Sequence, residues 1–161
     1  MPNMLNHQKL GIEWTGNLGT GTSGFREYAR LYRIFAEGKP DIPGTSDPAF
    51  SGDPTRWNPE ELLLASISAC HKLWYLHFCA VSGVVVTEYV DNCEGTMRIR
   101  DGEIGKMEEV ILRPKVTIIR GDPEAAFELH ALSHEKCFIA NSMNFPIRLE
   151  PEIIGPQSAV A

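Results

Sequence analysis

The chain has 161 residues, with 15 basic and 21 acidic side chains, a net charge of −6 and 43% hydrophobic residues. This composition is typical of one ordinary globular domain, or of two very small ones, and a chain of this length buries about 68–70% of its unfolded surface, so it needs no disulfide or metal to fold. The acidic balance, without a cluster of Lys and Arg, excludes nucleic acid as an expected partner.

The N-terminal residues bear on the compartment in which the chain acts. Met1 to Lys9 contains neither a basic segment nor an apolar run, so we expect no secretory signal and a cytoplasmic location. In a reducing cytosol the four cysteines are expected to be thiols with a chemical role, or core residues, rather than disulfides.

The N-terminal part of the chain predicts a hairpin. Residues 9–16 alternate between apolar and polar or small side chains, which indicates a strand. The glycine-rich residues 17–24 have the G-x-G-x-x-G spacing that binds a pyrophosphate when it lies between a strand and a helix. Residues 25–38 fit both helical and strand periodicity. We favour a strand, which makes the glycines a hairpin loop rather than a dinucleotide site.

A proline-rich stretch precedes a long apolar helix. Residues 38–59 hold five of the 11 prolines, and we interpret them as a loop over a pocket or as a plain connector. Asn58 as N-cap and Pro59 in the first turn begin a helix that we expect to end near Ser82, with Gly83 as its stop. Its polar side chains, among them Lys72, argue against a membrane span and predict burial in a core or an oligomer interface.

The C-terminal half predicts further strands and one more helix. Residues 84–100 and 108–121 alternate like two strands joined by a turn at 101–106. The other expected elements are a helix over 123–141, a strand over 144–153 and a loose tail over 155–161. This order predicts an α+β fold with an antiparallel sheet around the long helix, in a single domain over 1–161 with its core at roughly 9–154.

Two cysteines are candidates for redox chemistry. Cys70 lies in the middle of the apolar helix, where the helix N-terminus cannot stabilise a thiolate, so a cation must come from elsewhere. The candidates for that cation are Arg26, Arg30 and Arg56. Cys137 is expected near the end of the second helix, and a second thiol is what rescues a sulfenic acid as a disulfide before it oxidises further.

The run from Asn58 to Cys70, NPEELLLASISAC, resembles the signature of the osmotically inducible protein C and organic hydroperoxide resistance (OsmC/Ohr) family. The resemblance implies an intertwined homodimer with two sites at the subunit interface and thiol-dependent reduction of organic hydroperoxides. It implies Cys70 as the peroxidatic residue, Cys137 as the resolving residue, and Glu60 as the carboxylate that orients an arginine, for which Arg26 ranks first. An external dithiol, such as a lipoyl-type thiol, would restore the cysteines without any bound cofactor.

Helix geometry adds a constraint on this implied site. Ten residues at about 1.5 Å rise separate Glu60 from Cys70 by roughly 15 Å along a straight helix. Either the helix begins later than expected, or the Glu60 and Cys70 of one site come from different subunits.

Other functions compete with the peroxidase. His130, His134 and Cys137 have the spacing H-x3-H-x2-C, which places three candidate zinc ligands on about one face of the second helix. A binding protein for an apolar ligand, with incidental cysteines, is a third possibility. Apolar side chains near the cysteines, Trp74 and Phe138 among them, would form either a wall for bulky peroxides or ordinary core.

Overall fold

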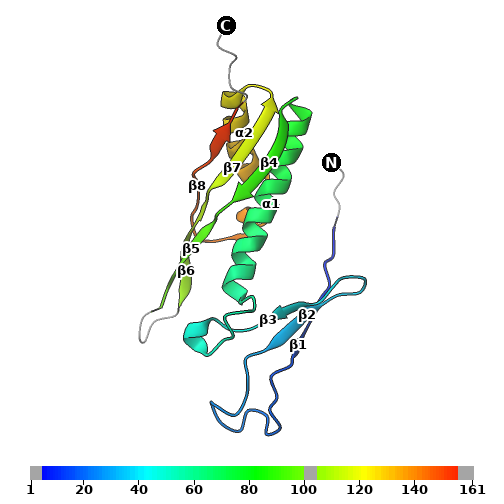
Figure 1. Cartoon of the computed structure of the whole chain (residues 1–161), viewed down its shortest axis with the longest axis vertical. Coiled ribbons are helices and arrows are strands. Elements are labelled where there is room, and N and C mark those ends of the chain that lie inside the picture. The colour runs from blue at the N-terminus through cyan, green and yellow to red at the C-terminus, as the bar shows by residue number, and fades with distance from the viewer. Residues whose placement is uncertain (1–4, 100–104, 156–161) are drawn as a thin grey trace. The chain divides into compact units, whose positions relative to one another are not determined.

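A computed structural model describes residues 5–99 and 105–155 (Figure 1). The chain forms two compact units, which divide between Leu63 and Leu64. The predicted turn at 101–106 and the predicted tail at 155–161 lie mostly outside the described residues. The prediction of a single domain stays a prediction.

The first unit contains a three-stranded antiparallel sheet of β1 (Gly11–Trp14), β2 (Tyr32–Phe35) and β3 (Ile42–Gly44) (Figure 1). The predicted strand over 9–16 and the hairpin are confirmed. No helix follows Gly24 in this described stretch, so the dinucleotide alternative is wrong. Residues 25–31, however, lie in a turn and an irregular segment rather than in the strand, because the hairpin loop extends well beyond the glycines.

The two faces of this first sheet differ in polarity. Cross-strand partners and strand alternation place a set of apolar side chains on one side, here named the apolar face. The apolar face consists of Ile12, Trp14, Tyr32, Ile34 and Ile42. The opposite side carries Arg33, which forms ion pairs with Glu13 and Asp41 and is therefore the solvated side. On the apolar face Ile12 is still 66% exposed, so nothing in the described chain covers it fully.

The proline-rich stretch has local structure rather than being an open loop. Besides β3 it contains a short 3-10 helix, η1 (Pro48–Phe50), whose first turn is capped by the Asp47 side chain accepting from the Ala49 amide. A parallel bridge pairs Gly44 with Trp57 just before the long helix. The stretch is therefore an ordered part of the first unit.

Helix α1 runs from Pro59 to Val81, and its caps explain both ends. The Asn58 side chain accepts from the Glu61 amide while the Glu61 carboxylate accepts from the Asn58 amide, which is a capping box. Gly83, with φ of 76°, follows the C-terminal end, as predicted. No helix among the described residues is both long enough and apolar enough to cross a membrane.

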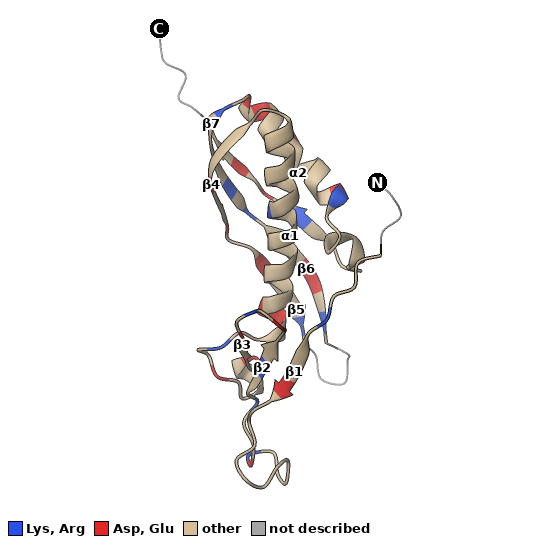
Figure 2. Ribbon diagram, turned by 90° about the vertical axis from the view of Figure 1, so that its right-hand side faces the viewer, with Lys and Arg blue, Asp and Glu red and all other residues tan. Residues whose placement is uncertain are grey.

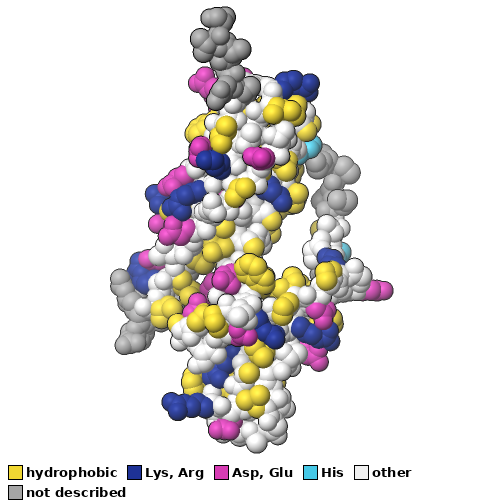
Figure 3. All heavy atoms as spheres, in the orientation of Figure 1, with side chains coloured by type: hydrophobic (Ala, Val, Ile, Leu, Met, Phe, Trp, Pro, Cys, Tyr) yellow, Lys and Arg dark blue, Asp and Glu magenta, His cyan; other side chains and the backbone are white. Residues whose placement is uncertain are grey.

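Only one stripe of α1 is buried within the chain. The buried residues fall at intervals of four: Ile67, His71, Tyr75 and Cys79. Other apolar side chains, such as Leu73 and Val81, are largely exposed. Figure 2 shows few charges along α1, and Figure 3 shows hydrophobic side chains at the surface of both units. The expected burial on every side is therefore not met by this chain alone.

The second unit contains two three-stranded sheets. One has the order β4-β7-β9 and the other β5-β6-β8. Their bounds are β4 Val85–Asp91, β7 Pro114–Arg120 and β9 Glu152–Ile154, with β5 Glu94–Arg98, β6 Lys106–Leu112 and β8 Ile147–Leu149. The pairs β4·β7 and β5·β6 are antiparallel, whereas β6·β8 and β7·β9 are parallel. The α+β class is confirmed, but these sheets are mixed rather than purely antiparallel.

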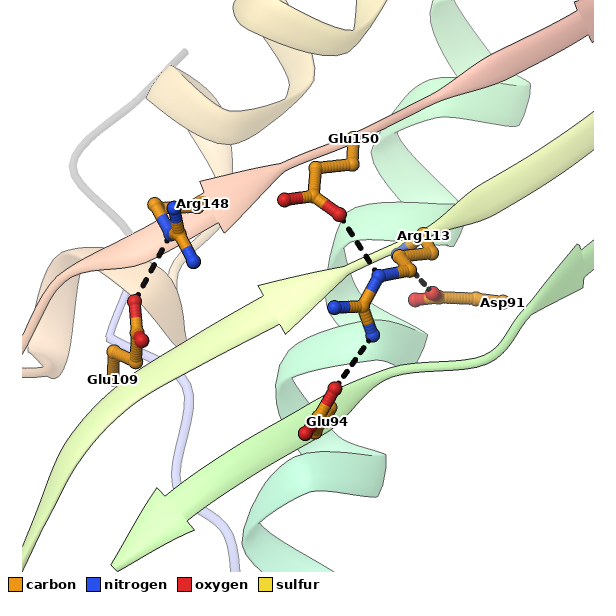
Figure 4. Close-up of polar contacts among 6 residues, drawn as sticks. All are labelled: Asp91, Glu94, Glu109, Arg113, Arg148 and Glu150. Carbon is orange, nitrogen blue, oxygen red and sulfur yellow. Dashed lines mark hydrogen bonds and ion pairs between the residues drawn. The ribbon is translucent and has the colours of Figure 1, made fainter.

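Each of the three strands predicted in this half is two strands in the structure: β4 and β5, β6 and β7, and β8 and β9. The three breaks lie at one cluster of polar contacts. The Arg113 amide donates to Asp91 Oδ1 at 2.7 Å, between β6 and β7, and Pro114 has no amide hydrogen to offer the ladder. The Arg113 guanidinium also reaches Glu94 and Glu150, each at 2.8 Å (Figure 4). This cluster ties the ends of β4, β5 and β6 to the segment between β8 and β9.

Helix α2 (Pro123–Lys136) packs over the core of the second unit. Asp122 caps its N-terminus by accepting from the Glu124 amide. The core joins Tyr75 and Cys79 of α1 with Val116 and Ile118 of β7 and with Ala126 of α2. The helix is five residues shorter than predicted, because Cys137 leaves helical geometry with ψ of 111° and residues 140–142 form a separate 3-10 turn, η2 (Ala140–Ser142).

Candidate active site

Two of the predicted site residues lie together in the second unit. Cys70 is on α1, and Cys137 is the C-cap residue of α2 rather than part of that helix. Their side chains hydrogen-bond to each other, and both are free thiols. Cys137 is buried, whereas Cys70 is partly accessible. The fold therefore brings together two sulfurs that are 67 positions apart in the chain.

The surroundings of Cys137 keep its sulfur protonated at neutral pH. Burial, together with the hydrogen bond to Cys70, raises the pKa of the Cys137 thiol to about 11. The backbone amides of Ile139 and Ala140 act in the opposite direction, and the Ala140 amide lies 3.4 Å from Cys137 Sγ. Because the amides do not overcome burial, Cys137 stays a protonated thiol at neutral pH.

Aromatic side chains flank the two thiols. Trp74 lies one helical turn beyond Cys70, and Phe138 directly follows Cys137. Their rings meet edge to face with centroids 5.6 Å apart, and Phe78 stacks on Trp74 at 5.4 Å. Phe138 is 70% exposed. A reactant at Cys70 would meet an aromatic surface that is open to solvent on one side.

His71 and His130 form a buried pair beside this region. His71 Nε2 and His130 Nδ1 are 3.0 Å apart, and the Tyr75 ring stacks on His130 at 3.8 Å between centroids. Burial lowers the pKa of His71 to about 4 and that of His130 to about 3, and the charge of a neighbouring histidine lowers each further. Both rings are therefore neutral at physiological pH.

The zinc alternative is not supported by this arrangement. His130 is engaged with His71 and Tyr75, and Cys137 is turned toward Cys70. Within residues 5–99 and 105–155, no group of three or more His, Cys, Asp or Glu side chains could hold a metal ion. The prediction of a site from His130, His134 and Cys137 is wrong because the helix ends before Cys137.

The remaining predicted residues belong to the first unit or to its boundary. Glu60 lies in the first turn of α1, where its Oε2 is buried and finds no hydrogen-bond partner among the described residues. Because α1 begins at Pro59, a later start of the helix is excluded, and Glu60 is about 15 Å from Cys70 along the axis. Arg26 is exposed in a turn, and Arg56 pairs with Asp53 at 3.5 Å.

The surroundings of Arg30 were not predicted from the sequence. Its guanidinium lies over the rings of Phe25 and Tyr28, and its Nη2 is buried without a hydrogen-bond partner in the described part of the chain. A strand over residues 25–38 would place Phe25 and Arg30 on opposite faces, so the sequence pattern gave no signal for a contact that the turn and irregular segment at 25–31 create.

The other two cysteines lie apart from the site. Cys79 is part of the core, and burial raises the pKa of its thiol. Burial and the charge of Asp91 raise the pKa of Cys93. Neither thiol is therefore activated as a nucleophile.

Comparisons with known proteins place these residues in context. A family model described as OsmC-like protein matches residues 52–152, more than half of the chain. An OsmC-like protein of unknown function from Vibrio cholerae is 25% identical, with 93% of this chain and 100% of that chain covered and a TM-score of 0.81. No curated protein matches the chain.

Two further solved structures share the fold at lower identity. An organic hydroperoxide resistance protein OsmC from Legionella pneumophila is 17% identical, covering 93% of this chain and 98% of that one, with a TM-score of 0.65. An organic hydroperoxide resistance protein from Elizabethkingia anophelis is also 17% identical, covering 95% and 100%, with a TM-score of 0.63. At this identity the likeness shows the fold alone.

Proposed function

Because the chain belongs to the OsmC-like protein family, we propose that it is a thiol-dependent peroxidase that reduces organic hydroperoxides to alcohols. The observation that carries the proposal is the contact between Cys70 and Cys137. An accessible thiol beside a buried, protonated one is the arrangement that a peroxidatic and a resolving cysteine require.

The proposed cycle has three steps. The Cys70 thiolate attacks the distal oxygen of the hydroperoxide, and the O–O bond breaks to leave Cys70 as a sulfenic acid and an alkoxide that takes up a proton. The Cys137 thiol then attacks the Cys70 sulfur, which releases water and forms a disulfide. An external cytosolic dithiol of the lipoyl type supplies two electrons and two protons to restore both thiols, without a bound cofactor.

The proposal includes a homodimer. Leu73 and Val81 leave apolar surface on α1, and Ile12 does the same on the apolar face of the first sheet. Exposed apolar surface of this extent is typical of an association site. A second copy of the chain would cover both surfaces and would allow the Glu60 of one chain to serve the Cys70 of the other, which one chain cannot do along a single helix.

The decisive experiment is an intact-mass measurement after one equivalent of cumene hydroperoxide. We expect a loss of two mass units, mapped to a peptide that links Cys70 to Cys137. The variant Cys70→Ser should lose reduction of cumene hydroperoxide with dihydrolipoamide, whereas Cys93→Ser serves as the matched control and should keep it. Wild-type turnover in Cys70→Ser would refute the function, and a stable addition of oxygen without a disulfide would deny Cys137 its role.

Binding of an apolar ligand has one observation in its favour. A cleft of about 350 Å³ lies at the C-terminal end of α1, where it is lined mainly by apolar side chains such as Leu76 and Val85, with Arg120 among them. Cys70 does not line this cleft. A pure binding protein predicts neither turnover nor a disulfide in the mass experiment.

A further inference from the structure

A dithiol must open the disulfide of the proposed cycle, and the two sulfurs of that disulfide differ in access. Cys137 is fully buried, whereas Cys70 is partly accessible. In thiol–disulfide exchange the incoming thiolate bonds to one sulfur while the other leaves, and access helps to decide which sulfur is attacked. A reductant therefore reaches the sulfur of Cys70, which makes Cys137 the leaving group.

A buried sulfur is a poor leaving group unless its negative charge is stabilised. Burial and the contact with Cys70 raise the pKa of the Cys137 thiol. A thiol with a high pKa leaves slowly in disulfide exchange. Any group that stabilises a thiolate at Cys137 therefore speeds the opening of the disulfide.

Two backbone amides face the Cys137 sulfur. The Ala140 amide nitrogen lies 3.4 Å from Cys137 Sγ, and the second amide is that of Ile139. Both amides lower the pKa of the Cys137 thiol, in opposition to burial. Successive backbone N–H groups form concave sites that favour negative charge. Donors that are already in place stabilise such a charge without any rearrangement when it appears.

Hydrogen bonds within the segment hold these amides in position. Each carbonyl oxygen from Cys137 to Ala140 accepts a hydrogen bond from residues 141–143. Asn141 makes two of the bonds that join the segment to the end of α2. Its Nδ2 donates to the Glu135 carbonyl oxygen at 2.8 Å, and its backbone amide donates to the Cys137 carbonyl oxygen at 3.0 Å. The segment is thus fixed with its carbonyl groups engaged and two amides directed at the sulfur.

We propose that the reductant attacks the Cys70 sulfur and that Cys137 leaves as a thiolate, stabilised by the two amides that face it. Asn141 is the positioning residue that keeps these amides in place. All of these groups belong to the second unit. The inference rests on the proposed function and deepens its last step, the return of the two cysteines to thiols.

The step balances as follows. A thiolate of the dithiol bonds to Cys70 Sγ, and the bond between the two cysteines breaks with its electron pair on Cys137, which then takes up a proton. The second sulfur of the reductant attacks the first, and Cys70 is released as a thiolate. The dithiol departs as a cyclic disulfide after losing two electrons, and its two protons end on the two cysteines.

The first test identifies the sulfur that is attacked. Wild-type protein is oxidised with diamide, which forms the disulfide without peroxide, then mixed with excess 2-mercaptoethanol at pH 7 and quenched in acid. Peptide mass spectrometry should find the mixed disulfide on Cys70 at least about tenfold more often than on Cys137. Oxidised protein unfolded in guanidinium chloride is the control and should carry similar amounts on both cysteines. An adduct mainly on Cys137, or equal amounts in the folded protein, would overturn the assignment.

The second test measures how fast dithiothreitol reduces the diamide-oxidised protein in a single turnover. Ala140→Pro removes the N–H that contacts Sγ and should slow reduction by about five- to tenfold. Ala140→Ser keeps that N–H and should stay within about twofold of wild type. Asn141→Ala should slow reduction by about two- to fivefold through loss of the bond to Glu135. Asn92→Ala, at an exposed position between β4 and β5, is its control.

The direction of the rate change separates this role from simple shielding. If the segment only covered Cys137, loosening it with Ala140→Pro or Asn141→Ala would expose the sulfur and speed reduction. Faster or unchanged reduction in both variants would overturn the role of the amides, as would an equal loss in Ala140→Ser. Asn141→Ala and the adduct on wild-type protein decide the case even if Ala140→Pro does not fold. Because diamide forms the disulfide, failure of the proposed function is detected separately, by turnover of cumene hydroperoxide.

Discussion

The buried pair of His71 and His130 should make the stability of the fold depend steeply on pH in mild acid. Both pKa values lie below the ordinary value near 6.5, at about 4 for His71 and about 3 for His130. The unfolded chain therefore binds protons at these positions before the folded chain does. The contribution to stability is fully present above pH 6.5 and is lost as the pH falls from 6.5 toward 4.

The size of the effect follows from the number of protons taken up on unfolding. Each histidine that is neutral when folded and protonated when unfolded lowers the free energy of unfolding by about 1.4 kcal/mol for each pH unit below 6.5. For two such groups the loss between pH 8 and pH 5 is about 4 kcal/mol, a large part of the 5–15 kcal/mol roughly expected of a whole domain.

Urea unfolding at fixed protein concentration, followed by circular dichroism between pH 5 and pH 8, measures this dependence. A change of less than about 1 kcal/mol over that range would refute the reasoning for wild type. His71→Gln combined with His130→Gln should reduce the slope to that of the remaining groups, even though the variant is less stable at every pH. His77→Gln, at an exposed position on the same helix, is the control and should keep the wild-type slope.

Three further substitutions test other parts of the structure. Phe138→Ala should lower kcat/KM for cumene hydroperoxide by about two- to tenfold relative to tert-butyl hydroperoxide, because one ring of the aromatic pair is lost. An equal fall for both substrates would contradict a role of Phe138 in selectivity. The control is Phe127→Ala, which changes an exposed side chain of α2. Asn58→Ala should cost about 1 kcal/mol in urea unfolding through loss of the helix cap. Asp91→Ala should cost about 2 kcal/mol, since it removes acceptors from the Arg113 amide and from Ser68, whereas Lys115→Ala at an exposed ion pair should stay within about 0.5 kcal/mol.

Local signals predicted the parts of the fold that depend on neighbours in sequence. The start of α1 follows from Asn58, Pro59 and Glu61, which interact within one turn, and its end follows from Gly83. The alternation of apolar and polar residues also predicted the hairpin and the α+β class. These features need no partner from a distant part of the chain.

Features that depend on distant contacts were missed. The break between β6 and β7 rests on Asp91 accepting from the Arg113 amide, 22 positions away, and periodicity carries no trace of that bond. Helical spacing also predicted that α2 continues through Cys137. In the structure α2 ends at Lys136, and the Cys137 side chain hydrogen-bonds to Cys70 of α1. The contacts of Arg30 with the rings of Phe25 and Tyr28 were missed because residues 25–31 were predicted as part of a strand, whereas they form a turn and an irregular segment.

The contact between Cys70 and Cys137 has a consequence for the energy of the oxidised state. A disulfide between them would close a loop of about 68 residues, which removes roughly 4 kcal/mol of chain entropy from the unfolded ensemble. Folding already holds the two sulfurs in contact, so the folded chain loses almost no freedom on closure. Oxidation would therefore stabilise the native state, and by linkage the native fold makes the disulfide harder to reduce than one between two unconstrained thiols. The dithiol of the proposed cycle would then have to be strongly reducing, with two thiols that can form a disulfide with each other.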